Sequence, residues 1–207
     1  VTDDYFGFLD DNEGLQISSH LLDVGIGRFP VVTTQQAEDV VNKTIHYMEN
    51  KEKGNWKNQI CFLADDGDGA LHMRQADSIV SLVSRNNPGF QYNKIYLDSY
   101  LQEVAASGES YPLAKTKFHN MLSSGVFLLY YTGHASQLGW TNEQILTTAD
   151  IKEMYNTRLP FWIGATCDFI LFDVKEISAG EHVLLNPAGG GIGLFSAART
   201  VYASKNE

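Results

Sequence analysis

The sequence is short of basic residues and has no long apolar run. Its 207 residues include 15 Lys and Arg against 25 Asp and Glu, which gives a formal net charge of −10. Binding to a phosphate backbone needs a basic face, so we expect no nucleic-acid partner. The longest apolar stretches, such as residues 126–131, are far too short to span a bilayer.

Cysteine is also scarce, since Cys61 and Cys167 are the two in the chain. Two cysteines make no disulfide scaffold, and the sequence does not show whether they pair. No charged and then apolar leader opens the chain. Motifs for a serine-hydrolase elbow, a phosphate-binding loop and internal repeats are missing as well.

What is present is a core-forming composition with alternating elements. Apolar residues make up 43% and charged residues 19%, which suits one sizeable globular domain. From residue 60 onwards, compact apolar runs alternate with amphipathic segments, which predicts a mostly parallel sheet with helices on both faces. Expected strands are 60–64, 94–97, 126–131, 161–166 and 191–197, and expected helices are 35–50, 71–84, 111–124 and 148–155. Residues 5–9 and 15–22 are predicted to be short strands or extended segments, and Thr33 or Thr34 caps the first helix.

Three of these expected strands end in reactive side chains. The first ends at Asp65 and Asp66, another runs into His134, and another runs into Cys167 and Asp168. Because ligands bind at the carboxyl ends of parallel strands, these groups can converge. A thiol, an imidazole that assists it and a carboxylate that orients the imidazole are what cysteine nucleophilic catalysis requires.

Each of these residues also has a plainer interpretation. A lone cysteine at a strand end is often a small buried hydrophobe, and Cys61, inside a strand, is expected in the core. The carboxylates of Asp65, Asp66 and Asp68 could be turn formers or ligands of a hard cation such as calcium. The remaining histidines are expected to be mostly solvated: His20, His46, His72, His119 and His182. The glycine-rich residues 189–193 precede an expected strand, so a dinucleotide-binding loop is rejected.

Two stretches carry a family resemblance. Residues 130–136 (Tyr-Tyr-Thr-Gly-His-Ala-Ser) resemble the Asn-Tyr-Thr-Gly-His-Gly-Ser stretch of the gingipain family of cysteine peptidases. Residues 165–169 (Ala-Thr-Cys-Asp-Phe) resemble its Ala-Thr-Cys-Glu-Phe stretch. The opening at residues 5–9 and the turn at 64–68 look most like the PorU-type branch, the cell-surface sortases of the type IX secretion system. Other landmarks of the resemblance lie at 25–30, 43–47, 180–182 and 199–202.

The resemblance implies a caspase-like fold, a three-layer α/β/α sandwich with a mostly parallel sheet. Residues 1–55 would be the remnant of a smaller N-terminal subdomain. Residues 56–207 would form the catalytic core, truncated at its C-terminal end. The chain is then an internal fragment of an exported protein that acts at the outer-membrane surface or outside the cell.

The resemblance also implies roles for particular residues. Cys167 takes the place of the nucleophile and His134 that of the general acid/base. Asp66 falls where the family has the acidic residue behind the histidine, with Asp65 one position away. The backbone N–H groups of Ala135 and Cys167 match the oxyanion hole. Family members usually have Gly at the position of Ala135, so a positive φ there would strain this chain.

A substrate pocket is implied by the same comparison. Thr132, Ala165 and Tyr202 align with its walls. The acidic residue with which gingipains bind a basic side chain aligns near Gly69, and Asp68 is next to it.

The function that follows is a cysteine endopeptidase or sortase that acts on secreted protein cargo through a thioester. Hydrolysis and transpeptidation share that thioester, so the sequence does not separate them. The alternative is a catalytically impaired gingipain-like binding or assembly module. Expected partners are a protein or peptide substrate and secretion-system components at the outer membrane. No cofactor is required, and a structural calcium ion at Asp65, Asp66 and Asp68 is left open.

Overall fold

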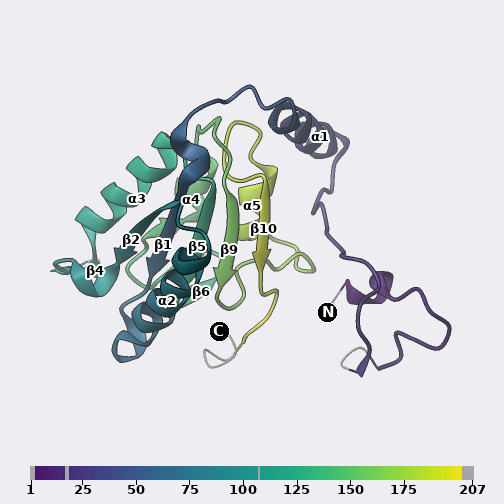
Figure 1. The fold of residues 1–207 in the computed structure, drawn as a ribbon, viewed down its shortest axis with the longest axis horizontal. Coiled ribbons are helices and arrows are strands. Elements are labelled where there is room, and N and C mark those ends of the chain that lie inside the picture. Colours follow the sequence, from purple (N-terminus) through teal and green to yellow (C-terminus); the bar gives the residue numbers. More distant parts are fainter. Residues whose placement is uncertain (1–2, 17–18, 107, 202–207) are drawn as a thin grey trace.

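The centre of the molecule is a five-stranded sheet in the order β10-β9-β5-β1-β2 (Figure 1). The computed structural model describes residues 3–16, 19–106 and 108–201. All neighbouring strands of this sheet are parallel, which confirms the predicted mostly parallel sheet. The strands are β1 (Gln59–Ala64), β2 (Gln91–Tyr96), β5 (Leu128–Thr132), β9 (Phe161–Ala165) and β10 (Gly193–Ser196).

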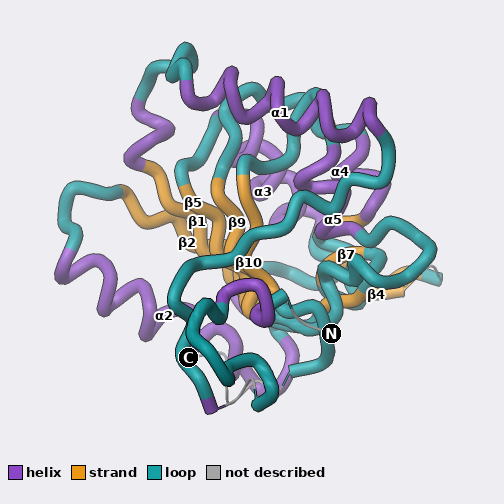
Figure 2. The backbone as a smooth tube through the Cα atoms, turned by 90° about the vertical axis from the view of Figure 1, so that its right-hand side faces the viewer, coloured by secondary structure: helices purple, strands orange, loops and turns teal. Residues whose placement is uncertain are grey.

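An apolar cluster covers each face of the sheet. On one face, Ile60 and Phe62 of β1 pack with α2 (Gly67–Asn86). On the other face, Cys61 and Leu63 join a cluster that includes residues of α3 (Pro112–Ser124), α4 (Thr148–Lys152) and α5 (Ala179–Leu185). Because side chains alternate between the two faces along a strand, β1 contributes residues to both clusters. Figure 2 shows α2 on one side of the strands and the other three helices beyond them, which confirms the three-layer sandwich.

Capping residues set where several helices begin. α1 (Thr34–Met48) starts after Thr33, whose side-chain oxygen accepts a hydrogen bond from the N–H of Gln36 at 3.1 Å in a capping box. Thr33 is therefore the cap of the helix predicted at 35–50. Thr147 caps α4 in the same way. At the start of α5, the Glu181 carboxylate accepts hydrogen bonds from the N–H and the hydroxyl of Ser178 at 2.8 and 2.7 Å.

Some elements differ from the prediction. Residues 5–9, expected to be extended, begin inside a 3-10 helix, η1 (Asp4–Gly7), and the described part of 15–22 contains no strand. The helix α5 was not predicted, because nearly all of its residues are buried and it therefore shows no amphipathic period. Short pieces complete the fold: η3 (Asn55–Asn58), η4 (Leu97–Ser99), the hairpin β3 (Glu103–Ala105) and β4 (Gly108–Ser110), and a small sheet of β6 (Ala135–Ser136), β7 (Gly139–Trp140) and β8 (Leu146–Thr147).

The segment before α1 lies beside the core and buries little (Figure 1). It exposes large apolar side chains, among them Leu15 and Leu21 at 89% each. The Arg28 guanidinium pairs with Asp3 at 2.5 Å and stands 4.5 Å from the ring centre of Phe172. The division into 1–55 and 56–207 stays a prediction. Among the described residues, no helix is long and apolar enough to cross a membrane.

Candidate active site

The register of β5 and β9 brings the predicted dyad to one edge of the sheet. Thr132 pairs with Ala165, and His134 and Cys167 each follow two residues later. The hydroxyl of Thr166 donates a hydrogen bond to the Gly133 carbonyl at 2.6 Å, which ties the two loops together. The imidazole and the thiol therefore leave neighbouring strands at the same carboxyl edge, where ligands of such sheets bind.

A third strand end holds the His134 loop. Ala64 at the end of β1 pairs with Thr132, and the next residue, Asp65, accepts a hydrogen bond from the His134 N–H at 3.0 Å through Oδ2. Gly133 has φ of 150°, and a Cβ there would stand 2.3 Å from the Cβ of Asp65. Glycine is therefore required between Thr132 and His134.

The backbone of His134 is fixed while its ring is open to solvent. Its carbonyl accepts hydrogen bonds from the Tyr131 hydroxyl at 2.5 Å and from the Thr141 N–H at 3.0 Å. Its side chain is 55% exposed. The ring can therefore meet a substrate without a rearrangement of the loop.

Three carboxylates in one turn have different neighbours. Asp68 Oδ2 lies 3.4 Å from His134 Nε2. Asp66, predicted to stand behind the histidine, accepts a hydrogen bond from the Tyr111 hydroxyl at 2.6 Å through its Oδ2. Asp65 binds the backbone of His134, as described above. The catalytic role of Asp66 stays a prediction, and the carboxylate that the structure places against the ring belongs to Asp68.

The backbone of residues 68–70 explains this placement. Asp68, Gly69 and Ala70 have φ of 58°, 61° and 63°, so three successive residues are left-handed before the regular part of α2 begins. Asp tolerates this region and Gly favours it, whereas Ala at this φ is strained by about 1–2 kcal/mol. The turn points the Asp68 carboxylate back toward the strand ends.

His72 is a site residue that the sequence analysis missed. It was expected among the mostly solvated histidines, but it is buried on α2 and its ring packs edge-on against His134, with ring centres 5.3 Å apart at 88°. Burial lowers the pKa of His72. The signal that could have found it is its position near the start of α2, the helix that follows the strand end at Asp65.

Burial also shifts the pKa of Asp65. Its carboxylate is only 3% exposed, and loss of solvation raises its pKa to about 6, against a hydrogen bond from the His134 backbone that lowers it. Asp65 is thus a carboxyl group whose charge is costly at neutral pH.

Cys167 is a free, half-buried thiol. Its sulfur donates a hydrogen bond to the Val201 carbonyl at 3.3 Å, and the Val201 N–H stands 3.4 Å from the same sulfur. Cys61 is free too, but fully buried, and burial raises its pKa to about 12, so its prediction as a core residue is confirmed.

The remaining predicted site residues lie around this edge. Ala135 opens β6, and φ is not positive there, so the strain expected from replacing Gly does not arise. Thr132 is fully buried, Ala165 is half-buried, and the Asp68 side chain is 51% exposed. Tyr202 lies outside the described residues.

Two groups of side chains near this edge could hold a cation. Asp65, Asp66 and Glu143 offer carboxylate oxygens within 4.8 Å of one another, an all-oxygen set of the kind that calcium prefers. Asp68, predicted as the third ligand, instead contacts the imidazoles. Asp65, His72 and His134 form a second group of the same compactness, with nitrogen as well as oxygen donors.

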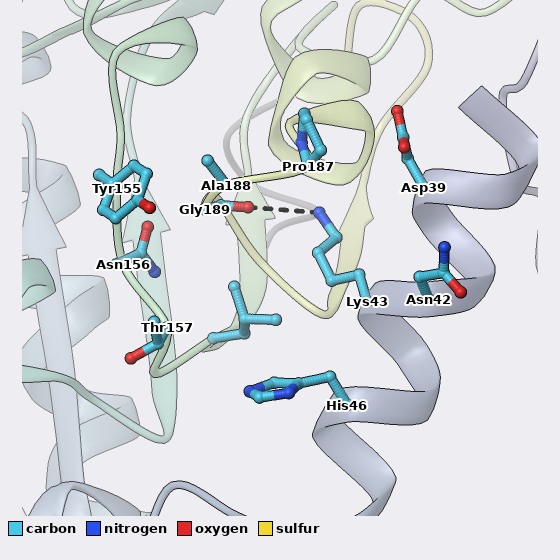
Figure 3. A pocket seen from close by; sticks show the side chains of 11 residues that line it. Asp39, Asn42, Lys43, His46, Tyr155, Asn156, Thr157, Pro187, Ala188 and Gly189 are labelled. Carbon is cyan, nitrogen blue, oxygen red and sulfur yellow. Dashed lines mark hydrogen bonds between the residues drawn. The ribbon is translucent and has the colours of Figure 1, made fainter. Parts of the chain in front are cut away.

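The opposite, amino edge of the sheet holds a cavity of about 330 Å³ between α1 and the loops before β9 and β10 (Figure 3). Lys43 of α1 points into it and donates hydrogen bonds to the carbonyls of Leu184, Asn186 and Gly189 at 2.6, 2.9 and 3.3 Å. Desolvation lowers its pKa to about 8. The glycine-rich residues 189–193 thus lie between α5 and β10 and do not form a dinucleotide-binding loop. Through the Gly189 carbonyl, this stretch helps to hold α1.

A parallel α/β/α sandwich with an imidazole and a thiol at adjacent strand ends defines the class of caspase-like folds. The family model described as Peptidase family C25 matches residues 1–207, so the chain belongs to that family. The family resemblance predicted from residues 130–136 and 165–169 is confirmed.

Solved structures and curated proteins agree with this assignment. The crystal structure of the Arg-specific cysteine proteinase gingipain R superimposes with a TM-score of 0.72 at 20% identity, covering 97% of this chain and 44% of that chain. A complex of the pro- and mature domains of RgpB from Porphyromonas gingivalis gives 0.66 at 18% identity, covering 89% and 43%. Gingipain R2 of the same species is 25% identical over 158 residues, which are 72% of this chain and 19% of the relative. The chain thus spans under half of these proteins.

Proposed function

We propose that this chain is the catalytic part of a cysteine endopeptidase, with Cys167 as nucleophile and His134 as general acid/base. The register that places both residues two positions beyond the Thr132–Ala165 pair carries the proposal. Membership of a peptidase family supports a protein or peptide substrate. The relatives named as gingipains support export to the cell surface or beyond.

The proposed reaction uses the groups at this edge as follows. The Cys167 thiolate attacks the substrate carbonyl carbon, and the backbone N–H groups of Ala135 and Cys167 hold the resulting oxyanion. The C–N bond then breaks while the His134 imidazolium protonates the leaving amine. This leaves a thioester on Cys167. His134 next takes a proton from the attacking water or amine, and the sulfur leaves as thiolate.

The identity of that second nucleophile separates a peptidase from a sortase. The resemblance of residues 5–9 and 64–68 to the PorU-type branch supports transfer of the acyl group to an amine, with partners in the type IX secretion apparatus. We include this transfer in the proposal. No metal enters the chemistry, and a calcium ion at Asp65, Asp66 and Glu143 would be structural.

A second candidate is the non-catalytic binding or assembly module. The contact that favours it is the Val201 backbone, which touches the Cys167 sulfur with both its carbonyl and its N–H. In that case the segment at 199–201 would keep the thiol occupied and no peptide would be cut.

A mass-spectrometric assay with a peptide library tests these alternatives. We incubate the protein with the library, with and without glycinamide as amine acceptor. The expected products are cleaved peptides and, with the acceptor, amide-linked adducts, both absent in Cys167→Ala and both present in Cys61→Ala. Cleavage without adducts would contradict the sortase step. If neither the parent protein nor Cys61→Ala cleaves any peptide, the result would contradict the peptidase and favour the binding module.

A further inference from the structure

Two imidazoles share one carboxylate oxygen at the carboxyl edge of the sheet. Asp68 Oδ2 lies 3.4 Å from His134 Nε2 and 3.5 Å from His72 Nε2. Both distances exceed those of ordinary N–H···O hydrogen bonds, about 2.7–3.2 Å. They match the separation of two ligands on one tetrahedral zinc ion, about 3.3 Å for bonds of about 2.0–2.1 Å. The spacing between Asp68 and each imidazole therefore suits an ion held by that carboxylate and the imidazole.

The base of this cluster is formed by two buried side chains, those of His72 and Asp65. The His72 side chain is 3% exposed, and Gln75 and the Asp68 carboxylate are the polar groups near its ring. Among the described residues, neither ring nitrogen makes a hydrogen bond of good geometry. Buried polar atoms usually have one, because leaving them without a partner costs free energy. Asp65 stands behind, with a carboxylate oxygen within 4.8 Å of donor nitrogens on both histidines. A bound cation would give the buried imidazole a ligand bond and would balance the negative charge of the buried carboxylate.

The mouth of the cluster is open to solvent, because the side chains of Asp68 and His134 are 51% and 55% exposed. An ion can therefore enter without unfolding the turn. Imidazole nitrogens mixed with carboxylate oxygens favour zinc over calcium or magnesium, which prefer oxygen alone.

We infer that Asp68, His72 and His134, with Asp65 behind them, form a reversible Zn²⁺ site. The ion takes the Nε2 lone pair of His134 and turns the ring into a ligand. Zinc binding itself stands apart from the proposed function, whereas its consequence, reversible inhibition of the peptidase, rests on it.

Zinc titration against a chromophoric chelator tests the site. The background is Cys167→Ala, which removes the thiol as a competing ligand. We expect one zinc ion per chain, bound at least tenfold more weakly after Asp68→Asn or His72→Gln. Asn is at home in the left-handed region that residue 68 occupies, so the first variant keeps the turn. Glu38→Gln is the matched control, since Glu38 is an exposed carboxylate on α1 away from the cluster, and its zinc affinity should not change.

Three results would overturn the site: no zinc bound in the Cys167→Ala background, equal affinity in Asp68→Asn, or a comparable loss in Glu38→Gln. The two proposals fail separately. Zinc binding in the expected pattern by a protein that cleaves no peptide in EDTA contradicts the peptidase alone. Peptide cleavage in EDTA that zinc leaves unchanged, together with equal affinities, contradicts the zinc site alone.

Discussion

At the scale of single residues, the three aspartates of the turn after β1 each contact a different group. Asp65 holds the His134 backbone, Asp66 accepts from Tyr111, and Asp68 meets the imidazoles. The sequence predicts that these carboxylates lie near the thiol and the imidazole, because all follow strand ends. It does not predict their individual directions, since these depend on three left-handed residues of which only Gly69 signals such a turn.

Asp65 gives a pH dependence that can be measured. Its pKa of about 6 in the folded protein lies above the ordinary 3.8, so between these values the native state binds a proton that the unfolded chain does not. Stability should therefore fall as pH rises from about 4 to about 6, by about 2–3 kcal/mol from this group, at about 1.4 kcal/mol per pKa unit. Asp65→Asn should remove that fall in urea unfolding between pH 4 and 7.

The exposed carboxylate of Glu38 on α1 provides the control for this experiment. Glu38→Gln should keep the pH slope of the parent protein. If Asp65→Asn and the parent lose stability in parallel as pH rises, Asp65 does not carry the buried charge assigned to it.

At the scale of elements, the strands are the part that the sequence predicts well. The runs at 60–64, 126–131 and 161–166 are apolar because both faces of β1, β5 and β9 are covered. The short helix α5 escapes prediction for the same reason, since burial on all sides erases its period. The landmark lysine at 43 is recognisable in the sequence, but its partners lie more than 140 residues away.

The contacts of Lys43 predict that α1 is held to the core through its ammonium group. Lys43→Met keeps the apolar stem of the side chain but leaves the carbonyls of Leu184, Asn186 and Gly189 without this donor. We expect a loss of about 1–3 kcal/mol in the free energy of unfolding and faster hydrogen exchange in α1. The exposed Lys53 offers a matched control, and Lys53→Met should change neither quantity. Unchanged exchange in α1 after Lys43→Met would show that other contacts hold the helix.

At the scale of the whole molecule, the two edges of the sheet have different roles: one carries the candidate active site and the other holds α1. Its carboxyl edge carries the thiol, the imidazoles and the carboxylates, and its amino edge carries the Lys43 anchor of α1. The sequence predicts the class of fold from the alternation of elements. The strand order β10-β9-β5-β1-β2 does not follow from it, because alternation alone does not say which parallel strands are neighbours. That order makes β5 and β9 adjacent and so places His134 and Cys167 after neighbouring strand ends.

The central claim is that His134 activates Cys167 as a nucleophile, and its most direct test is the rate of covalent labelling. We treat the protein with a peptidyl chloromethyl ketone and follow the intact mass and the modified peptide, with EDTA present to keep zinc away. We expect one adduct on Cys167, none on the buried Cys61, and labelling slower by roughly 10²-fold or more in His134→Gln, as loss of an acid/base group predicts. An adduct on Cys61, or an unchanged rate in His134→Gln, would contradict the account.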